Sequence, residues 1–160
     1  MALIIPARTT TRVPEHTPPE LNDRIRRGTD ETIAFYAGAD RDTIERRLAE
    51  LDEEWDIERV LEANAASVSL IGLLLTATVS RKFFVLPVAV AGFLLQHAVQ
   101  GWCPPLPILR RLGFRTETEI NHERYALKAL RGDFQGVQPS VEASVEAASR
   151  VETAIDAVRR

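Results

Sequence analysis

The residue best suited to chemistry is Cys103, which is the only cysteine in the chain. Arg110 and Arg111 follow it closely, and nearby positive charge favours the thiolate, which is the reactive form of a cysteine. A persulfide carrier or a redox sensor would use such a thiol. A simpler interpretation is that Cys103 is a small apolar side chain that packs where a helix ends, and we favour it.

The second candidate is His97, six residues before Cys103. This spacing does not put the two side chains on adjacent turns of one helix face, so a Cys–His pair would need another helix or a second subunit to bring them together. A polar residue inside an apolar segment is a functional suspect. However, Gln96, His97 and Gln100 also suit the interfacial end of a membrane helix, and we prefer that explanation.

The rest of the sequence offers no catalytic constellation, because it has no P-loop, no G-x-G-x-x-G motif and no nucleophile elbow. A single cysteine excludes an internal disulfide and a multi-cysteine metal site. The acidic residues between positions 50 and 56 lack an ordered ligand spacing. The net charge of −3 combines many charges of both signs, which does not favour nucleic acid. We therefore expect no catalytic residue, no metal, no cofactor and no nucleic-acid partner.

Two long uncharged segments, residues 63–80 and 83–109, lie on either side of the basic pair Arg81-Lys82. The first would be about 26 Å long as a helix, close to the minimum for a hydrocarbon core about 30 Å thick. In the second, residues 83–99 are the expected span. Both segments are apolar on all faces. The sequence predicts an all-α fold, a two-helix transmembrane hairpin flanked by amphipathic cytoplasmic helices. A buried helix pair in a soluble helical oligomer is the alternative.

Basic residues are more frequent on the two flanks of the hairpin than at its tip. This pattern predicts a multi-pass membrane protein with both termini in the cytoplasm. Tryptophan and basic side chains are expected to anchor it at the membrane interface: these are Trp55, Trp102, Arg81, Lys82, Arg110 and Arg111. Small residues allow close packing of helices in lipid: these are Ala63, Ala66, Gly72, Ala89 and Gly92. Besides the lipid bilayer, we expect a homo-oligomer, dimer or higher, and an unidentified protein partner.

The remaining segments are predicted from proline content, capping residues and apolar periodicity. We expect a disordered arm at 1–20, an amphipathic helical segment at 21–55, the membrane hairpin at 56–114, an amphipathic helix at 115–135 and a C-terminal helix at 136–160. Within 21–55, one short helix should end at Gly28 and another should open at Asp40. The stripe of the latter comprises Ile44, Leu48, Leu51 and Trp55. Asp56 either caps a new helix or lies inside a continuous one.

Gly101, Cys103 and Pro104, followed by Leu112-Gly113, resemble the end of the bacterial YgaP-like inner-membrane domain. The entry to the first span, residues 57–61, also resembles that family. The similarity covers about residues 56–114 and implies a hairpin in the bacterial inner membrane that dimerises with both ends in the cytoplasm. This chain differs in Pro105-Leu106-Pro107 and in a longer Cys–Gly spacing. Some members carry a rhodanese domain; none is visible here, so sulfurtransferase activity is not implied.

The function expected from these features is that of a non-enzymatic integral membrane protein. Its hairpin would anchor cytoplasmic helices for self-association or for binding a partner. One alternative is a thiol-dependent sulfur or redox carrier at the membrane that uses Cys103, with His97 as a possible second member of the site. The other alternative is the soluble helical oligomer.

Overall fold

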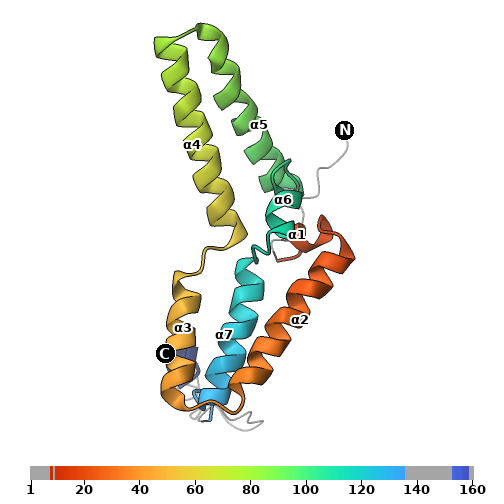
Figure 1. Ribbon diagram of the computed structural model, residues 1–160, viewed down its shortest axis with the longest axis vertical. Coiled ribbons are helices and arrows are strands. Elements are labelled where there is room, and N and C mark those ends of the chain that lie inside the picture. The colour runs from red at the N-terminus through yellow and green to blue at the C-terminus, as the bar shows by residue number, and fades with distance from the viewer. Residues whose placement is uncertain (1–7, 9, 136–152, 159–160) are drawn as a thin grey trace, which may run out of the picture. The chain divides into compact units, whose positions relative to one another are not determined.

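A computed structural model describes residues 8, 10–135 and 153–158, and every regular element among them is helical. The elements are α1 (Arg12–Glu15), α2 (Pro19–Tyr36), α3 (Arg41–Glu53), α4 (Ile57–Thr78), the 3-10 helix η1 (Arg81–Phe84), α5 (Val85–Gln100), α6 (Leu106–Arg111) and α7 (Glu117–Arg131) (Figure 1). The prediction of an all-α chain is confirmed for this part of the sequence.

The chain divides into two compact units, and each unit combines segments that are distant in sequence. The first comprises Met1–Gly28 with Glu54–Ile120, and the second comprises Thr29–Glu53 with Asn121–Arg160. Segments 21–55 and 115–135 each contribute residues to both units.

Three helix starts are capped by side chains. The Asp40 carboxylate accepts a hydrogen bond from the Thr43 amide at 2.8 Å, and Asp56 accepts one from the Arg59 amide at 2.7 Å. Asp56 thus begins α4 as a separate helix, which settles the choice that the sequence left open. Thr116 and Glu119 form a reciprocal capping box at the start of α7.

The expected arm at residues 1–20 is not wholly irregular. Residues 12–15 form α1, and Val13 is only 2% exposed because it packs in the apolar core of the first unit. The expected helix break at Gly28 is also wrong, since α2 continues through this glycine to Tyr36. A glycine costs a helix only about 1 kcal/mol; a long helix can therefore absorb it.

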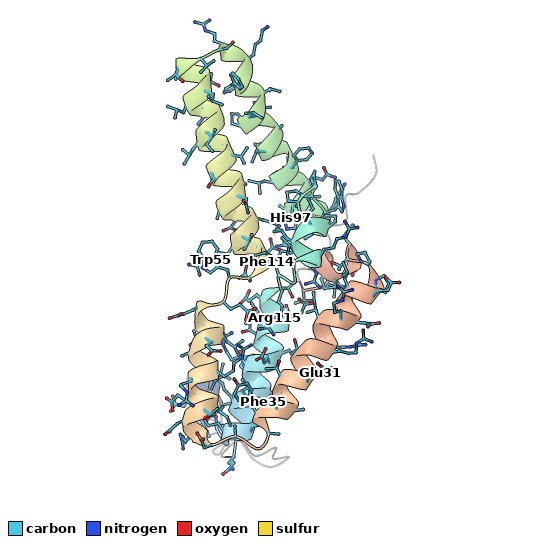
Figure 2. The ribbon with its side chains drawn as sticks, in the orientation of Figure 1. Glu31, Phe35, Trp55, His97, Phe114 and Arg115 are labelled. Carbon is cyan, nitrogen blue, oxygen red and sulfur yellow. The ribbon has the colours of Figure 1, made fainter. Side chains whose placement is uncertain are left out.

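Helices α4 and α5 carry most of the apolar surface of the first unit (Figure 2). Each belongs to a helical stretch that is long and apolar enough to cross a membrane. Only 17% of the most apolar window in the first stretch and 6% of that in the second are buried within the chain. A core helix of a soluble monomer would be mostly buried, so the part of the chain that the structure describes does not cover these two helices.

At Gly72, α4 lies in close contact with the start of α5. A Cβ atom there would lie 2.8 Å from Cδ of Pro87 and 2.9 Å from Cβ of Leu86, whereas a Cβ at Gly92 would meet nothing within 4 Å. Gly72 therefore has the packing position expected for a small residue. Of the other small residues, Ala66, Ala89 and Gly92 are exposed and Ala63 is half-buried, so the three exposed ones lie outside this helix contact.

Replacing Gly72 with alanine is expected to destabilise the helix pair by about 1–3 kcal/mol, because Pro87 and Leu86 must move to make room. Gly92→Ala is the matched control and should be neutral or stabilising by up to about 1 kcal/mol, since it only improves helix propensity. Unfolding in mixed micelles, followed by circular dichroism, measures both changes. Equal effects of the two substitutions would contradict the close contact at Gly72.

A buried cluster around Arg110 fixes the end of α6 in the first unit. The guanidinium forms two hydrogen bonds with the Glu119 carboxylate, at 2.7 and 2.8 Å. It also donates to Thr17 Oγ1, to Asn22 Oδ1 and to the carbonyl of Phe114. Arg110 is 1% exposed, so the expectation that it reaches lipid headgroups is wrong. Arg111, the next residue, is exposed as that role requires.

The Glu119 carboxylate makes the first unit sensitive to acid. Burial alone would raise the pKa of Glu119, but hydrogen bonds from Arg110 and Thr116 hold that pKa below its usual value of 4.5. A lowered pKa contributes stability that is present above the unfolded value and is lost as the pH falls through the folded value. We expect the melting temperature of the wild type to fall more steeply below about pH 4.5 than that of Glu119→Gln. Parallel curves for the two proteins would contradict this role.

The second unit contains the amphipathic stripe of α3. Ile44, Leu48 and Leu51 are buried as predicted. Glu123 of α7 is also buried and accepts a hydrogen bond from Nε of Arg47 at 2.8 Å. The fourth predicted member of the stripe, Trp55, lies beyond the end of α3.

The predicted C-terminal helix, residues 136–160, falls largely outside the described residues. Residues 153–158 are helical. Ala157 is buried, and Nζ of Lys128 donates to the carbonyl of Val158 at 3.2 Å. The expected seam along the rest of this segment stays a prediction.

Candidate functional site

The turn after α5 brings Cys103 back toward the helix that precedes it. Gly101 ends α5 with a positive φ of 82°, and its amide donates to the carbonyl of His97 at 2.7 Å. This left-handed conformation suits glycine. The Cys103 thiol interacts electrostatically with the His97 ring. The turn alone therefore brings the two residues together, which corrects our expectation that a second span or subunit is needed.

The His97 ring is fixed by a carboxylate from the other helix of the pair. Its Nε2 lies 2.8 Å from Oε2 of Glu58, near the start of α4. The second carboxylate oxygen of Glu58 accepts a hydrogen bond from Nη2 of Arg12 at 2.8 Å. Arg12, Glu58 and His97 thus form a continuous polar chain that leads to Cys103. The His97 side chain is only 6% exposed.

The proton positions in this chain follow from the hydrogen-bonding capacity of each group. An ionised carboxylate can only accept, so Nε2 of His97 must donate to Glu58. Nδ1 is buried, and the ring interacts with the Cys103 thiol as well as with Glu58. The Glu58 carboxylate thus orients the ring beside the thiol.

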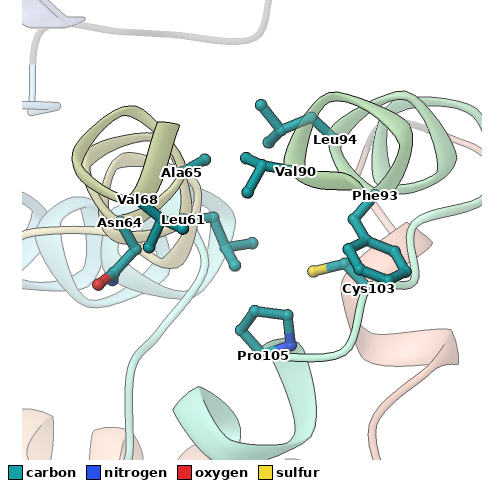
Figure 3. Close-up of a pocket in the computed structure, with 9 residues that line it drawn as sticks. All are labelled: Leu61, Asn64, Ala65, Val68, Val90, Phe93, Leu94, Cys103 and Pro105. Atoms are coloured by element: carbon teal, nitrogen blue, oxygen red, sulfur yellow. The ribbon is translucent and has the colours of Figure 1, made fainter. Parts of the chain in front are cut away.

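An apolar cavity of about 110 Å³ opens beside the thiol (Figure 3). Its wall consists of side chains from α4, α5 and the following turn: Leu61, Asn64, Ala65, Val68, Val90, Phe93, Leu94, Cys103 and Pro105. Asn64 is the one amide in this wall, and its Nδ2 donates to the carbonyl of Val60. The sulfur of Cys103 points toward the interior of the lining (Figure 3). A molecule in this cavity would meet hydrocarbon on most sides and the thiol on one.

The structure also places the residues that we expected at the membrane interface. Arg81 and Lys82 are exposed in η1, between α4 and α5. Trp55 is 47% exposed and stacks against the Arg59 guanidinium, which lies 4.4 Å from the ring centroid. Trp102 is half-buried. These exposures are compatible with interface anchoring, except at Arg110.

Sequence reasoning missed Glu58 and Arg12 as members of the site. Glu58 lies beside Ile57, Val60 and Leu61, which are all buried. A carboxylate in that position needs a partner, and this was the available signal. Arg12 lies in a segment that composition marked as irregular, so nothing in its surroundings pointed to Glu58.

No group of three or more His, Cys, Asp or Glu side chains that could hold a metal ion occurs among the residues that the structure describes. No family model, curated protein or solved structure matches the chain.

Proposed function

We propose that this chain is an integral membrane protein in which α4 and α5 form a two-helix transmembrane hairpin. Its remaining helices would lie on the cytoplasmic side and mediate self-association or partner binding. The observation that carries the proposal is the exposed apolar surface of both helices, including Leu70, Leu74, Val85 and Leu95, each more than 60% exposed. Lipid is the environment in which such a surface is stable.

The dimensions and charges of the helix pair support this placement. At about 1.5 Å per residue, the uncharged part of α4, residues 63–78, would be about 24 Å long and α5 with η1 about 30 Å, near the thickness of a hydrocarbon core. Arg81 and Lys82 lie where the two helices are joined, so their side chains would reach the headgroups on one side. The excess of basic residues on the flanks favours cytoplasmic termini. The resemblance to the YgaP-like domain implies the same arrangement.

Carbonate washing of membranes from expressing cells tests the proposal. A hairpin that lipid surrounds should stay in the pellet at alkaline pH, whereas a soluble helical oligomer should pass into the supernatant. Leu74→Lys should weaken insertion, because a lysine near the centre of a span costs about 2.5–3.5 kcal/mol on insertion scales. Glu62→Lys, at an exposed position near the start of α4, is the control and should remain in the pellet.

Self-association is the second part of the proposal. Ala66, Ala89 and Gly92 are small and exposed on the helix pair, and small residues allow two copies to approach closely in lipid. Cross-linking in native membranes should give a dimer or a higher oligomer. Leucine at Gly92 should reduce the cross-linked fraction, whereas an unchanged fraction would exclude this face from the contact.

A thiol-dependent role is a second candidate, and the polar chain Glu58–His97–Cys103 is the observation that favours it. Cys103→Ser separates the two functions. A pure anchor should keep its assembly and its cellular phenotype after this substitution. A sulfur or redox carrier should keep its assembly but lose its phenotype.

A further inference from the structure

A polar cavity of about 320 Å³ lies in the second unit, between α3 and α7. Side chains of both helices line it: Glu45, Leu48, Ala49 and Asp52 from α3, and Arg124, Lys128 and Arg131 from α7. A cavity of this size falls within the range of small-molecule binding sites. At about 30 Å³ of liquid for each water, it has room for about ten water molecules or for a small organic ion.

The wall that α7 contributes is basic. Arg124, Lys128 and Arg131 follow one another at spacings of four and three residues, so they lie on one face of the helix. Carboxylates hold the two arginines in place. Nη2 of Arg124 donates to Asp52 at 2.9 Å, and Nε and Nη2 of Arg131 donate to the two oxygens of Asp133. The two guanidinium groups are therefore already positioned at the cavity.

Lys128 differs from the two arginines, because its charge is buried without a carboxylate hydrogen bond among the described residues. Lys128 is 8% exposed, and its Nζ donates to the carbonyl of Val158 at 3.2 Å. Asp133 interacts with it electrostatically, but Arg131 already engages both oxygens of that carboxylate. A buried ammonium group carries three donors and needs polar partners for them. An anion in the adjacent cavity would supply such a partner.

We propose that this cavity binds a small phosphate monoester that carries hydroxyl groups. The phosphate would lie against Lys128 and accept charge-assisted hydrogen bonds from it and from the neighbouring Arg124 and Arg131. The hydroxyl groups would face the α3 wall, where the carboxylates of Glu45 and Asp52 accept hydrogen bonds. This site belongs to the second unit, so the inference goes beyond the proposed function and does not depend on the membrane placement of α4 and α5.

The acidic wall restricts the kind of anion that fits. The lining carries three basic and two acidic side chains, so a ligand with one phosphate is favoured over a polyphosphate, which Glu45 and Asp52 would repel. A phosphate monoester also occurs in a lipid, phosphatidic acid, but the glycerol hydroxyls of that lipid are esterified. The carboxylates of α3 therefore favour a free molecule such as glycerol 3-phosphate.

Isothermal titration calorimetry of the full chain in mild detergent, with glycerol 3-phosphate as the probe, tests the inference. We expect one molecule to bind per chain, and glycerol, which lacks the phosphate, not to bind. Lys128→Met should weaken binding by about 30-fold or more, as expected when one partner of a buried charge pair is lost. Lys82→Met is the matched control, because it replaces the other lysine of the chain at an exposed position in η1. It should bind glycerol 3-phosphate as the wild type does.

The melting temperature separates a ligand-binding role of Lys128 from a structural one. Because a buried charge without its anion is costly, Lys128→Met should melt at or above the temperature of the ligand-free wild type. It should also lose the rise in melting temperature that glycerol 3-phosphate gives the wild type. A lysine that only holds the fold together would give a lower melting temperature and unchanged binding.

A second pair of substitutions tests the cavity without altering a charge. Ala49→Leu fills space at a position that lines the cavity and should weaken binding by about tenfold through overpacking. Ala129→Leu adds the same bulk at an exposed position of α7 outside the lining and should leave binding unchanged.

Three results would overturn the inference: no saturable binding of glycerol 3-phosphate to the wild type, equal affinity in Lys128→Met, or equal effects of the two leucine variants. Dihexanoyl phosphatidic acid distinguishes the two sources of the phosphate group. Weaker binding of this lipid than of glycerol 3-phosphate supports recognition of the free hydroxyl groups. Equal or tighter binding of the lipid would overturn that part of the inference and assign the site to a lipid headgroup.

Discussion

Replacing Arg110 with alanine should destabilise the first unit by about 3–5 kcal/mol, the usual cost of removing one partner of a buried ion pair. The substitution leaves the Glu119 carboxylate without its two strongest hydrogen bonds. It also removes the hydrogen bonds that the guanidinium donates to Asn22 Oδ1 and to the Phe114 carbonyl. Equilibrium unfolding in mixed micelles, followed by the fluorescence of Trp55 and Trp102, measures the change.

Arg111→Ala is the matched control, because Arg111 is the next residue of α6 and is exposed. It should change the free energy of unfolding by less than about 0.5 kcal/mol. The double variant Arg110→Met/Glu119→Leu should recover much of the loss, since an apolar pair leaves no buried charge without its partner. A loss of stability below about 1 kcal/mol for Arg110→Ala would show that the ion pair between Arg110 and Glu119 contributes no more than an exposed one.

Gly101→Ala should be the second most damaging single change. An alanine at φ 82° costs about 1–2 kcal/mol for the left-handed backbone. Its Cβ would also lie 2.6 Å from both Cβ and the carbonyl oxygen of Arg12, so α1 must move, which adds about 1–3 kcal/mol. Movement of Arg12 would weaken its ion pair with Glu58.

Gly113→Ala separates the two contributions, because Gly113 has a φ of 92° but a Cβ there would meet nothing within 4 Å. The loss of stability in Gly113→Ala should therefore reflect the cost of the left-handed backbone alone. If both alanine variants lose the same stability, the contact between Gly101 and Arg12 does not exist in the folded protein. The melting temperatures of the two variants, measured in the same detergent, decide this.

Local rules predicted the helices and their starts well. Asp40 caps the helix that it was expected to open, and Asp56 takes the first of the two roles left open for it, because capping depends on a few neighbouring residues. The stripe of Ile44, Leu48 and Leu51 predicted the buried face of α3 for the same reason. The prediction that a helix ends at Gly28 was wrong, because the cost of one glycine, about 1 kcal/mol, is small compared with the stabilisation that a helix of 18 residues gains by packing.

Contacts between distant segments could not be predicted in this way. Arg110 looked like a headgroup anchor because it lies beside an apolar span, and only the fold brings Thr17, Asn22 and Glu119 to it. The prediction of the candidate site was incomplete for a related reason. Helical spacing separates His97 from Cys103, but the left-handed turn at Gly101 reverses the chain between them. Glu58 completes the site from 39 residues away.

The central claim is that lipid covers α4 and α5, and spin labels at Leu74 and Leu95 test it most directly. Each label would be attached to a cysteine at that position in a Cys103→Ala chain reconstituted into vesicles, with a label at the exposed Arg111 as the reference. Power saturation then compares collisions with oxygen, which concentrates in hydrocarbon, and with a water-soluble nickel chelate. We predict that oxygen dominates at Leu74 and Leu95 and that nickel dominates at Arg111. Low collision rates with both reagents at Leu74 and Leu95 would mean that protein covers these helices, and dominance of nickel there would mean that water does.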